Sequence, residues 1–299
     1  MRFLPEGPRV LRHQARPSLG WVAIQHGADA EAGSLNILDL AARTNVNHPL
    51  PGRPGFFAET TRPGVLLVGL ERRLVLYDLA ARRVEETGVA VPEHPRVIIN
   101  DGLAVEGGVI FGTKHLDFNQ PIAGLYFFDT RRRELVELRS GQTCSNGKML
   151  TGTTLIDIDS TPRAITRYQL DAGLRAVLSH LPLIAPASLP AYPDGLRPTP
   201  DGRGFIVAFF NPQAVPDGLA WHLDTDTGAV LGEWILPGSP RVTCPEFVEI
   251  DGAVKVLFTT ALEGMADDIR SVAPGAGQLY LADTPFDAMP APPPLVNIL

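Results

Sequence analysis

Three short motifs carry side chains that could do chemistry, and they recur at nearly equal spacing along the chain. Each pairs an amide or acid with a glycine: Asn100-Asp101-Gly102, Ser145-Asn146-Gly147 and Pro193-Asp194-Gly195. Asn146 follows Asn100 by 46 residues, and Asp194 follows Asn146 by 48. A fourth acidic candidate, Glu6, precedes the first strand-like segment. Their carboxylate and amide oxygens are donors that hard divalent cations take, so a cation site is one chemistry that these residues could support.

An isolated Asn-Gly or Asp-Gly pair usually indicates a β-turn, because these residues adopt positive φ at low cost. We interpret Asp201-Gly202, Asp217-Gly218 and Asp251-Gly252 as turns on that basis. The three motifs above are different, because their regular spacing would place them at one strand position in consecutive units of a repeat. We therefore keep them as candidate site residues.

The elements that must position these residues are short strands. Runs of Val, Ile, Leu, Phe and Tyr of strand length, such as residues 65–68 and 205–209, alternate with turn residues along the chain. Long apolar patterns with the helical period are nearly absent. Regular short strands separated by turn signals are typical of a sandwich, barrel or propeller.

A repeat favours the propeller over the sandwich. An apolar strand that ends in aspartate before a turn recurs six times, at Asp39, Asp78, Asp129, Asp171, Asp224 and Asp283. The mean separation is near 49 residues, the length of one four-stranded propeller blade. Blades cover their faces only by packing on one another, so the repeat predicts an all-β, six-bladed β-propeller. We expect residues 1–299 to form this single domain, with a proline-rich tail over about 285–299.

The composition narrows the classes of function. The 299 residues include 26 Lys and Arg against 33 Asp and Glu, and the net charge of −7 argues against a nucleic-acid partner. No apolar run approaches the ~18 residues of a membrane span, and the N-terminus lacks the apolar core of a secretory signal. Two cysteines, Cys144 and Cys244, do not make a disulfide framework. We expect a cytoplasmic protein, a monomer or weak homodimer, with no nucleic-acid or membrane partner.

Taken together, the motifs resemble those of the senescence marker protein 30/gluconolactonase/luciferin-regenerating-enzyme-like family. The matching segments, in order, are Glu6-Gly7-Pro8, Asn100-Asp101-Gly102, Phe111-Gly112-Thr113, Ser145-Asn146-Gly147, Pro193-Asp194-Gly195 and Thr243-Cys244 followed by residues 257–261. Each motif is short. Their order and spacing, from about Glu6 to about Ala261, make the resemblance more specific than any one of them.

The resemblance implies a six-bladed propeller that binds one divalent cation in its channel and hydrolyses sugar lactones. By motif, the metal ligands fall on Glu6, Asn146 and Asp194, and the substrate-binding asparagine falls on Asn100. Two carboxylates and an amide oxygen suit Ca²⁺, Mg²⁺ or Mn²⁺, with Zn²⁺ as a further option. Three protein ligands leave positions open for water and substrate, as a catalytic metal requires.

The resemblance also implies a mechanism, which is metal-assisted hydrolysis of a small-molecule lactone. The cation polarises the carbonyl and stabilises negative charge on its oxygen while water attacks the carbonyl carbon. Asp194 is expected to act as ligand and base at once and to take the proton of that water.

Several positions near the expected substrate depart from the family pattern. The sugar lactonases carry an Arg two residues before the Asn-Asp-Gly motif, where this chain has Ile98. An acidic substrate contact usually follows the Gly-Thr pair, where this chain has Lys114, His115 and Asp117. We expect Asp117 to replace that contact. Lys114 and His115 are expected to contact a substrate that differs from gluconolactone, either less hydroxylated or negatively charged.

Some alternatives stay open from sequence. The first motif matches least well, so Glu59 competes with Glu6 as the third ligand. Two other functions are a metal-dependent phosphotriester or other ester hydrolase, and a non-catalytic Ca²⁺-binding propeller. The spacing of the seven histidines does not indicate a zinc site, and only His115 is expected near the channel.

Overall fold

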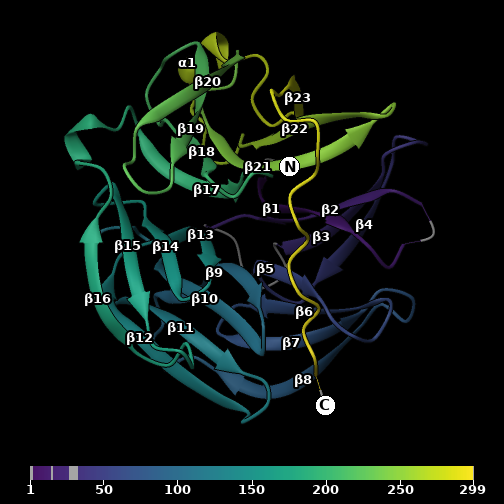
Figure 1. Cartoon of the computed structure of the whole chain (residues 1–299). Coiled ribbons are helices and arrows are strands. Elements are labelled where there is room, and N and C mark those ends of the chain that lie inside the picture. Colours follow the sequence, from purple (N-terminus) through teal and green to yellow (C-terminus); the bar gives the residue numbers. More distant parts are fainter. Residues whose placement is uncertain (1–2, 15, 27–32, 299) are drawn as a thin grey trace.

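In the computed structural model, six small antiparallel sheets are arranged as blades around a central channel (Figure 1). The structure describes residues 3–14, 16–26 and 33–298. Within these ranges, the first five sheets each have four strands in chain order and the sixth has three. The predicted all-β, six-bladed propeller is confirmed.

The first strand of each blade lies nearest the channel, and the following strands step outward. The first two blades contain β1 (Leu4–Leu11), β2 (Ser18–Ile24), β3 (Gly33–Asp39) and β4 (Thr44–Leu50), then β5 (Pro54–Glu59), β6 (Val65–Leu70), β7 (Arg73–Asp78) and β8 (Arg83–Ala90). The third and fourth blades contain β9 (Val97–Val105), β10 (Gly108–His115), β11 (Ala123–Asp129) and β12 (Glu134–Gln142), then β13 (Ser145–Thr151), β14 (Thr154–Asp159), β15 (Ala164–Leu170) and β16 (Val177–Pro182). The fifth and sixth blades contain β17 (Tyr192–Pro198), β18 (Gly204–Phe210), β19 (Asp217–Asp224) and β20 (Val230–Pro237), then β21 (Val242–Ile250), β22 (Ala253–Thr260) and β23 (Tyr280–Asp283). A 3-10 turn, η1 (Pro186–Ser188), and a short helix, α1 (Asp267–Val272), lie in connections.

Burial drops sharply at the outermost strand of a blade. In the second blade every residue of β6 is buried, whereas none of β8 is buried. In the third blade all of β10 and β11 is buried, whereas β12 is largely exposed. Strands such as β6, β10 and β11 are covered by neighbouring blades on both faces, which explains the continuous apolar runs in the sequence.

Aromatic side chains fill the seam between the second and third blades. The rings of Phe56 and Phe111 stack with centroids 5.7 Å apart, and Tyr126 continues the stack at 5.8 Å from Phe111. These rings belong to one buried cluster that also contains Val296 from the C-terminal tail.

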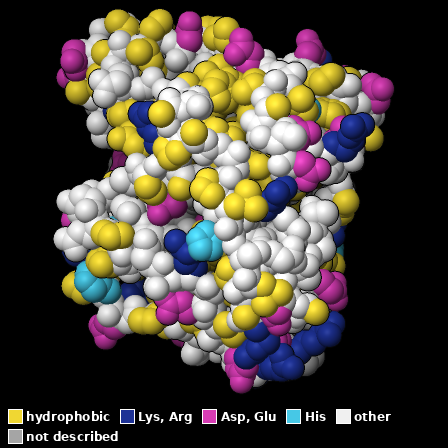
Figure 2. Space-filling model, turned by 60° about the vertical axis from the view of Figure 1, so that its left-hand side comes forward, with side chains coloured by type: hydrophobic (Ala, Val, Ile, Leu, Met, Phe, Trp, Pro, Cys, Tyr) yellow, Lys and Arg dark blue, Asp and Glu magenta, His cyan; other side chains and the backbone are white. Residues whose placement is uncertain are grey.

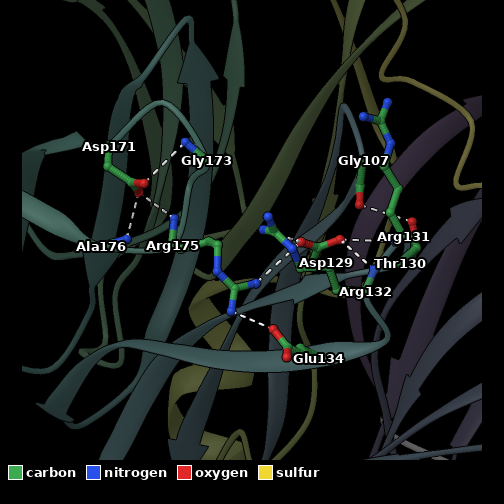
Figure 3. Close-up of polar contacts among 10 residues, drawn as sticks. All are labelled: Gly107, Asp129, Thr130, Arg131, Arg132, Glu134, Asp171, Gly173, Arg175 and Ala176. Atoms are coloured by element: carbon green, nitrogen blue, oxygen red, sulfur yellow. Dashed lines mark hydrogen bonds and ion pairs between the residues drawn. The ribbon is translucent and has the colours of Figure 1, made fainter.

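The repeated aspartate closes the turn after the third strand of a blade (Figure 3). Oδ1 of Asp129 accepts hydrogen bonds from the backbone N–H groups of Arg131 and Arg132, both at 3.0 Å. Asp39, Asp78 and Asp224 accept the same pair of bonds from the residues two and three positions later. The aspartate therefore repeats in the sequence because the same turn recurs from blade to blade.

The first and sixth blades meet through side chain to backbone contacts. Thr243 Oγ1 on β21 donates a hydrogen bond to Pro5 O on β1 at 2.7 Å. Gly7 N on β1 donates to Cys244 Sγ on β21 at 3.3 Å. These contacts close the ring between segments almost the full chain length apart.

The C-terminal tail crosses to the second blade, where β5 ends (Figure 1). Val296 N donates to Glu59 O at 2.9 Å, and Thr61 N donates to Val296 O at 3.0 Å. The Val296 side chain is only 1% exposed. The tail thus adds buried apolar contacts at the channel end where the inner strands finish.

Acidic and basic side chains are interspersed over the face seen in Figure 2. Hydrophobic side chains gather over the upper part of that view, where the fifth and sixth blades lie. None of the helices in the described residues has the length and apolar character needed to cross a membrane.

We predict that Val296→Ala lowers the free energy of unfolding by about 1–2 kcal/mol, because it removes buried methyl groups from the seam between the second and third blades. Urea unfolding would measure this change. The matched control is Val230→Ala in β20, whose side chain is 51% exposed and whose replacement should cost less than about 0.5 kcal/mol. Equal, small losses in both variants would show that the docked tail does not stabilise the ring.

Candidate active site at one end of the channel

A cavity of about 390 Å³ lies at the end of the channel where the inner strands begin. Its polar lining side chains are Glu6, His26, Asn100, Lys114, Asn146, Ser160, Asp194 and Glu263. Leu4, Phe118, Tyr192 and Phe210 contribute apolar wall. Residues predicted from sequence as a site are thus brought together from the first, third, fourth and fifth blades.

Bulges at one level of four inner strands position these side chains. In β13 the register with β14 shifts between Ser145 and Lys148, so two residues, Asn146 and Gly147, face one on the partner strand. The other shifts surround Asp194 in β17, surround Asn100 in β9 and directly follow Glu6 in β1. A bulge bends its strand and redirects a side chain, and here each bulge carries or adjoins a cavity residue.

The glycines of the three motifs serve close packing and not turns. All three lie within strands, and none has a positive φ. A Cβ at Gly147 would lie 2.7 Å from Asp194 O, and one at Gly195 would lie 2.9 Å from Thr243 O. A Cβ at Gly102 would lie 2.6 Å from the Phe56 ring. Each glycine therefore lets the inner strand of one blade approach its neighbour.

Asp194 and Glu6 are two carboxylates that face the same cavity, and Asp194 is buried whereas Glu6 is partly buried. Burial raises the pKa of Glu6 to about 7, although a hydrogen bond from Cys244 and the charge of Lys114 oppose that rise. Burial and then the negative charge of Glu6 hold the pKa of Asp194 well above its usual value. Asp194 Oδ1 is buried and has no hydrogen-bond partner among the described residues. Such an oxygen is rare in a folded protein and indicates a missing partner.

Hydrogen bonds fix the two cavity amides by their nitrogen atoms. Asn146 Nδ2 donates to Ser160 Oγ at 3.1 Å, and Ser160 Oγ donates to Pro193 O at 2.6 Å. Asn100 Nδ2 donates to Ser145 O at 2.8 Å. With the nitrogens engaged, the amide oxygens are the atoms available to a cation or a substrate.

Two thiols lie beside the predicted ligands. Cys244 Sγ donates to Glu6 Oε2 at 3.0 Å, so the sixth blade orients the carboxylate of the first. Cys144 Sγ lies 3.8 Å from Asn100 Nδ2 and 4.0 Å from Asn146 Nδ2. Burial raises the pKa of both thiols, which keeps them neutral in this structure.

A buried ion pair supports the strand that carries Asn146. Lys148 Nζ lies 3.4 Å from Asp157 Oδ1, and it also donates to Asp101 O at 3.2 Å and to Asn146 O. Ser145 Oγ and Gln142 Nε2 donate to the same Asp157 carboxylate at 3.0 and 2.6 Å. The third and fourth blades are thereby held in register just behind the cavity.

His26 and Glu263 form a pair at the wall that sequence reasoning did not select. His26 follows β2, Glu263 follows β22, and His26 Nδ1 lies 2.9 Å from Glu263 Oε2. Burial lowers the pKa of His26, and the charge of Lys114 lowers it further. Burial raises the pKa of Glu263, but hydrogen bonds from His26 outweigh it and leave the pKa below its usual value. Neither residue belongs to a motif, so only the folded ring pairs them.

Three residues considered from sequence lie outside the cavity lining. Asp117 is half exposed and pairs with Arg96. The neighbouring His115 is buried, with Nε2 at 3.9 Å from Asp117 Oδ2. Glu59 ends β5, where its carboxylate accepts from Arg12 N at 2.9 Å and His13 N at 3.0 Å. Glu6, and not Glu59, therefore faces Asn146 and Asp194, while substrate contacts of Asp117 and His115 remain predictions.

Among residues 3–14, 16–26 and 33–298, no three His, Cys, Asp or Glu side chains are grouped closely enough to hold a metal ion. The set predicted from sequence differs in kind, because it has two carboxylates and one amide.

Comparison with known proteins matches the chain to one family. A family model described as the SMP-30/Gluconolactonase/LRE-like region matches residues 4–262. L-arabinolactonase of Azospirillum brasilense is 28% identical over 244 residues, which span 79% of this chain and 76% of that protein.

Two solved structures share the fold. The calcium-binding protein regucalcin from Agrobacterium tumefaciens has a TM-score of 0.79 at 20% identity, over 98% of this chain and 93% of its own. A luciferin-regenerating enzyme has a TM-score of 0.79 at 20% identity, over 98% of this chain and 95% of its own. At this level of identity the likeness establishes the propeller architecture.

We predict that Gly147→Ala destabilises the protein by about 1–3 kcal/mol, because the added methyl group would push against the backbone of β17 and force the blades apart. Thermal and urea unfolding would measure the loss. Gly232→Ala in β20 is the control, since its Cβ would meet only His222 Cβ at 3.9 Å. If both variants unfold like the wild type, close approach of the inner strands does not constrain this position.

Proposed function

The chain belongs to the SMP-30/Gluconolactonase/LRE-like family, and we propose that it opens the ring of a sugar-type lactone by hydrolysis that depends on one divalent cation. The observation that carries the proposal is a set of two carboxylates and an amide, placed by bulges around one cavity. The relative named L-arabinolactonase supports the choice of a sugar lactone as substrate.

The residues around the cavity fit a divalent cation held by Glu6, Asn146 and Asp194. Asp194 Oδ1 is buried without a partner, and carboxylate and amide oxygens are ligands of hard cations. Among the described lining residues, three carboxylates face the single ammonium of Lys114, so one divalent cation would balance the formal charge. The donor set suits Ca²⁺, Mg²⁺ or Mn²⁺, with Zn²⁺ as a further option. When bound, the cation would supply Lewis-acid polarisation of the lactone carbonyl.

Side chains of the protein would carry out proton transfer and would bind the substrate. Asp194 takes a proton from the attacking water, and the oxygen of Asn100 accepts a hydrogen bond from a substrate hydroxyl. Phe118, Tyr192 and Phe210 offer apolar wall to the carbon face of the ring. Asp117 and His115 lie just outside this lining, so we propose that they act at the rim of the site.

The charge balance favours a neutral substrate over an anionic one. With the cation bound, the three carboxylates are offset by the cation and Lys114, so no excess positive charge remains for an acidic substrate. A neutral lactone keeps that balance until negative charge develops on its oxygens during the reaction.

We predict that the purified protein hydrolyses neutral lactones and loses this activity in the presence of a chelator. Acid release would be measured on gluconolactone, pentonolactones and γ-butyrolactone, with Ca²⁺, Mg²⁺, Mn²⁺ or Zn²⁺ restored after chelation. Recovery with one cation supports the proposal. A rise in melting temperature with cation but no turnover of any lactone would instead favour a non-catalytic cation-binding propeller.

Asp194→Asn is predicted to fold and to lose about 10²–10⁴-fold in kcat, because it removes the base and weakens the cation site. The control is Asp226→Asn in the same blade, whose side chain is 89% exposed. Turnover would be compared at saturating cation, with melting temperatures to verify folding. Near-normal turnover of Asp194→Asn would exclude Asp194 as the base.

A further inference from the structure

The chain contains three lysines, and their surroundings differ sharply. Lys255 lies on the outer part of the sixth blade and pairs with the exposed Asp283. Lys148 is fully buried and has a carboxylate and two carbonyl oxygens around its ammonium. Lys114 is only 2% exposed, and its ammonium makes no ion pair or hydrogen bond with any described residue.

Each of the other three buried cations among the described residues has a partner: Arg197 and Lys148 each pair with a carboxylate, and Arg241 Nη1 donates to the backbone oxygen of Glu263 at 2.6 Å. Arg197 Nη2 lies 2.7 Å from Glu246 Oε2, and Arg197 Nε donates to Glu246 Oε1 at 2.9 Å. Lys148 has Asp157 in the same way. A buried charge without a partner is destabilising, so a contact is expected wherever the charge serves structure alone. Lys114 differs from all three, because its ammonium has neither kind of contact among the described residues and it lines the cavity.

The position of Lys114 gives its ammonium access to a bound substrate. It comes from the end of β10 in the third blade, whereas Asp194 comes from β17 in the fifth. The positive charge of Lys114 acts on Glu6, Asp194 and Glu263, yet it stays beyond ion-pair distance of each. The ammonium of Lys114 and the carboxylate of Asp194 therefore approach the cavity from different blades. The donor hydrogens of Lys114 make no hydrogen bond with the described residues.

We propose that Lys114 is a catalytic residue that gives a proton to the ring oxygen of the lactone as the ring opens. This inference rests on the proposed hydrolysis and adds the acid that complements Asp194 as base. Opening a lactone of an aliphatic alcohol expels an alkoxide, which is a poor leaving group unless it receives a proton.

The step balances in atoms and protons. Water oxygen forms a bond to the carbonyl carbon, and one water proton moves to Asp194. The bond between that carbon and the ring oxygen then breaks, and the ring oxygen takes a proton from Lys114 Nζ. The proton held by Asp194 returns through solvent to Lys114, leaving the hydroxy acid as product.

Two substitutions and two substrates test this role. Lys114→Met removes the ammonium at similar length, and Lys114→Arg keeps the charge but not a proton that can be released. The substrates are γ-butyrolactone or a pentonolactone, which expel an alkoxide, and dihydrocoumarin, which expels a phenolate of pKa about 10 that needs little protonation. Lys255→Met is the control, because Lys255 does not line the cavity and its ammonium pairs with the exposed Asp283.

We expect both Lys114 variants to lose about 10²–10⁴-fold in kcat on the aliphatic lactone, while Lys255→Met is unchanged. On dihydrocoumarin, kcat of both Lys114 variants should fall by less than about tenfold, because a phenolate leaves without the acid. The rise in melting temperature caused by added cation should persist in both variants, which separates loss of the acid from loss of the cation site.

Activity of Lys114→Arg within about tenfold of wild type would overturn the proposal, because charge alone would then suffice. Equal losses of Lys114→Met on both lactones would overturn it too, since they would indicate a general effect on binding. If the wild type itself opens no lactone, the proposed hydrolysis fails and this role falls with it. A wild-type lactonase whose Lys114→Met variant is equally active contradicts only the role of Lys114.

Discussion

Close approach of the inner strands around the channel is the constraint on which the rest of the molecule depends. At Gly147 and Gly195 the backbone of one blade lies against the next, so no side chain fits between them. Residues beside these contacts must project along the channel, because the lateral space is filled by backbone. The bulges in β1, β9, β13 and β17 occur at this level and turn those residues toward the cavity. The contacts that pack the inner strands of the ring therefore also assemble the site.

Buried charged side chains have different partners at the seams between blades and in the cavity. At the seams Arg197 and Lys148 each have a carboxylate within hydrogen-bond or ion-pair distance, Glu246 for Arg197 and Asp157 for Lys148. In the cavity, Asp194 keeps an oxygen without a partner and Lys114 makes no ion pair among the described residues. Unpaired groups of this kind are expensive to bury, so their concentration in one place is a stronger mark of a site than the volume of the cavity.

The sequence predicted the features that repeat, because a repeated structural need leaves a repeated residue. The aspartates that close blade turns and the amide-glycine and acid-glycine motifs of the inner strands are of this kind. The close-packing role of those glycines was not predicted, since glycine serves both turns and close approaches, and only the neighbouring blade distinguishes the two. The pair of His26 and Glu263 was missed because it joins loops 237 residues apart. Asp117 was predicted by position alone, but its neighbour Arg96 engages its carboxylate.

The seam between the first and sixth blades also determines when the site forms during synthesis of the chain. Each blade is a meander of adjacent strands, so it can fold soon after its own residues emerge from the ribosome. The seam joins partners such as Glu6 and Cys244, which are 238 residues apart. At about 5–20 residues per second of synthesis, the first blade waits on the order of tens of seconds for the last. Its inner strand β1 is exposed along one side during that interval, and Glu6 meets Asn146 and Asp194 only when the ring closes. A nascent chain therefore has no complete site, and any activity reports finished molecules only.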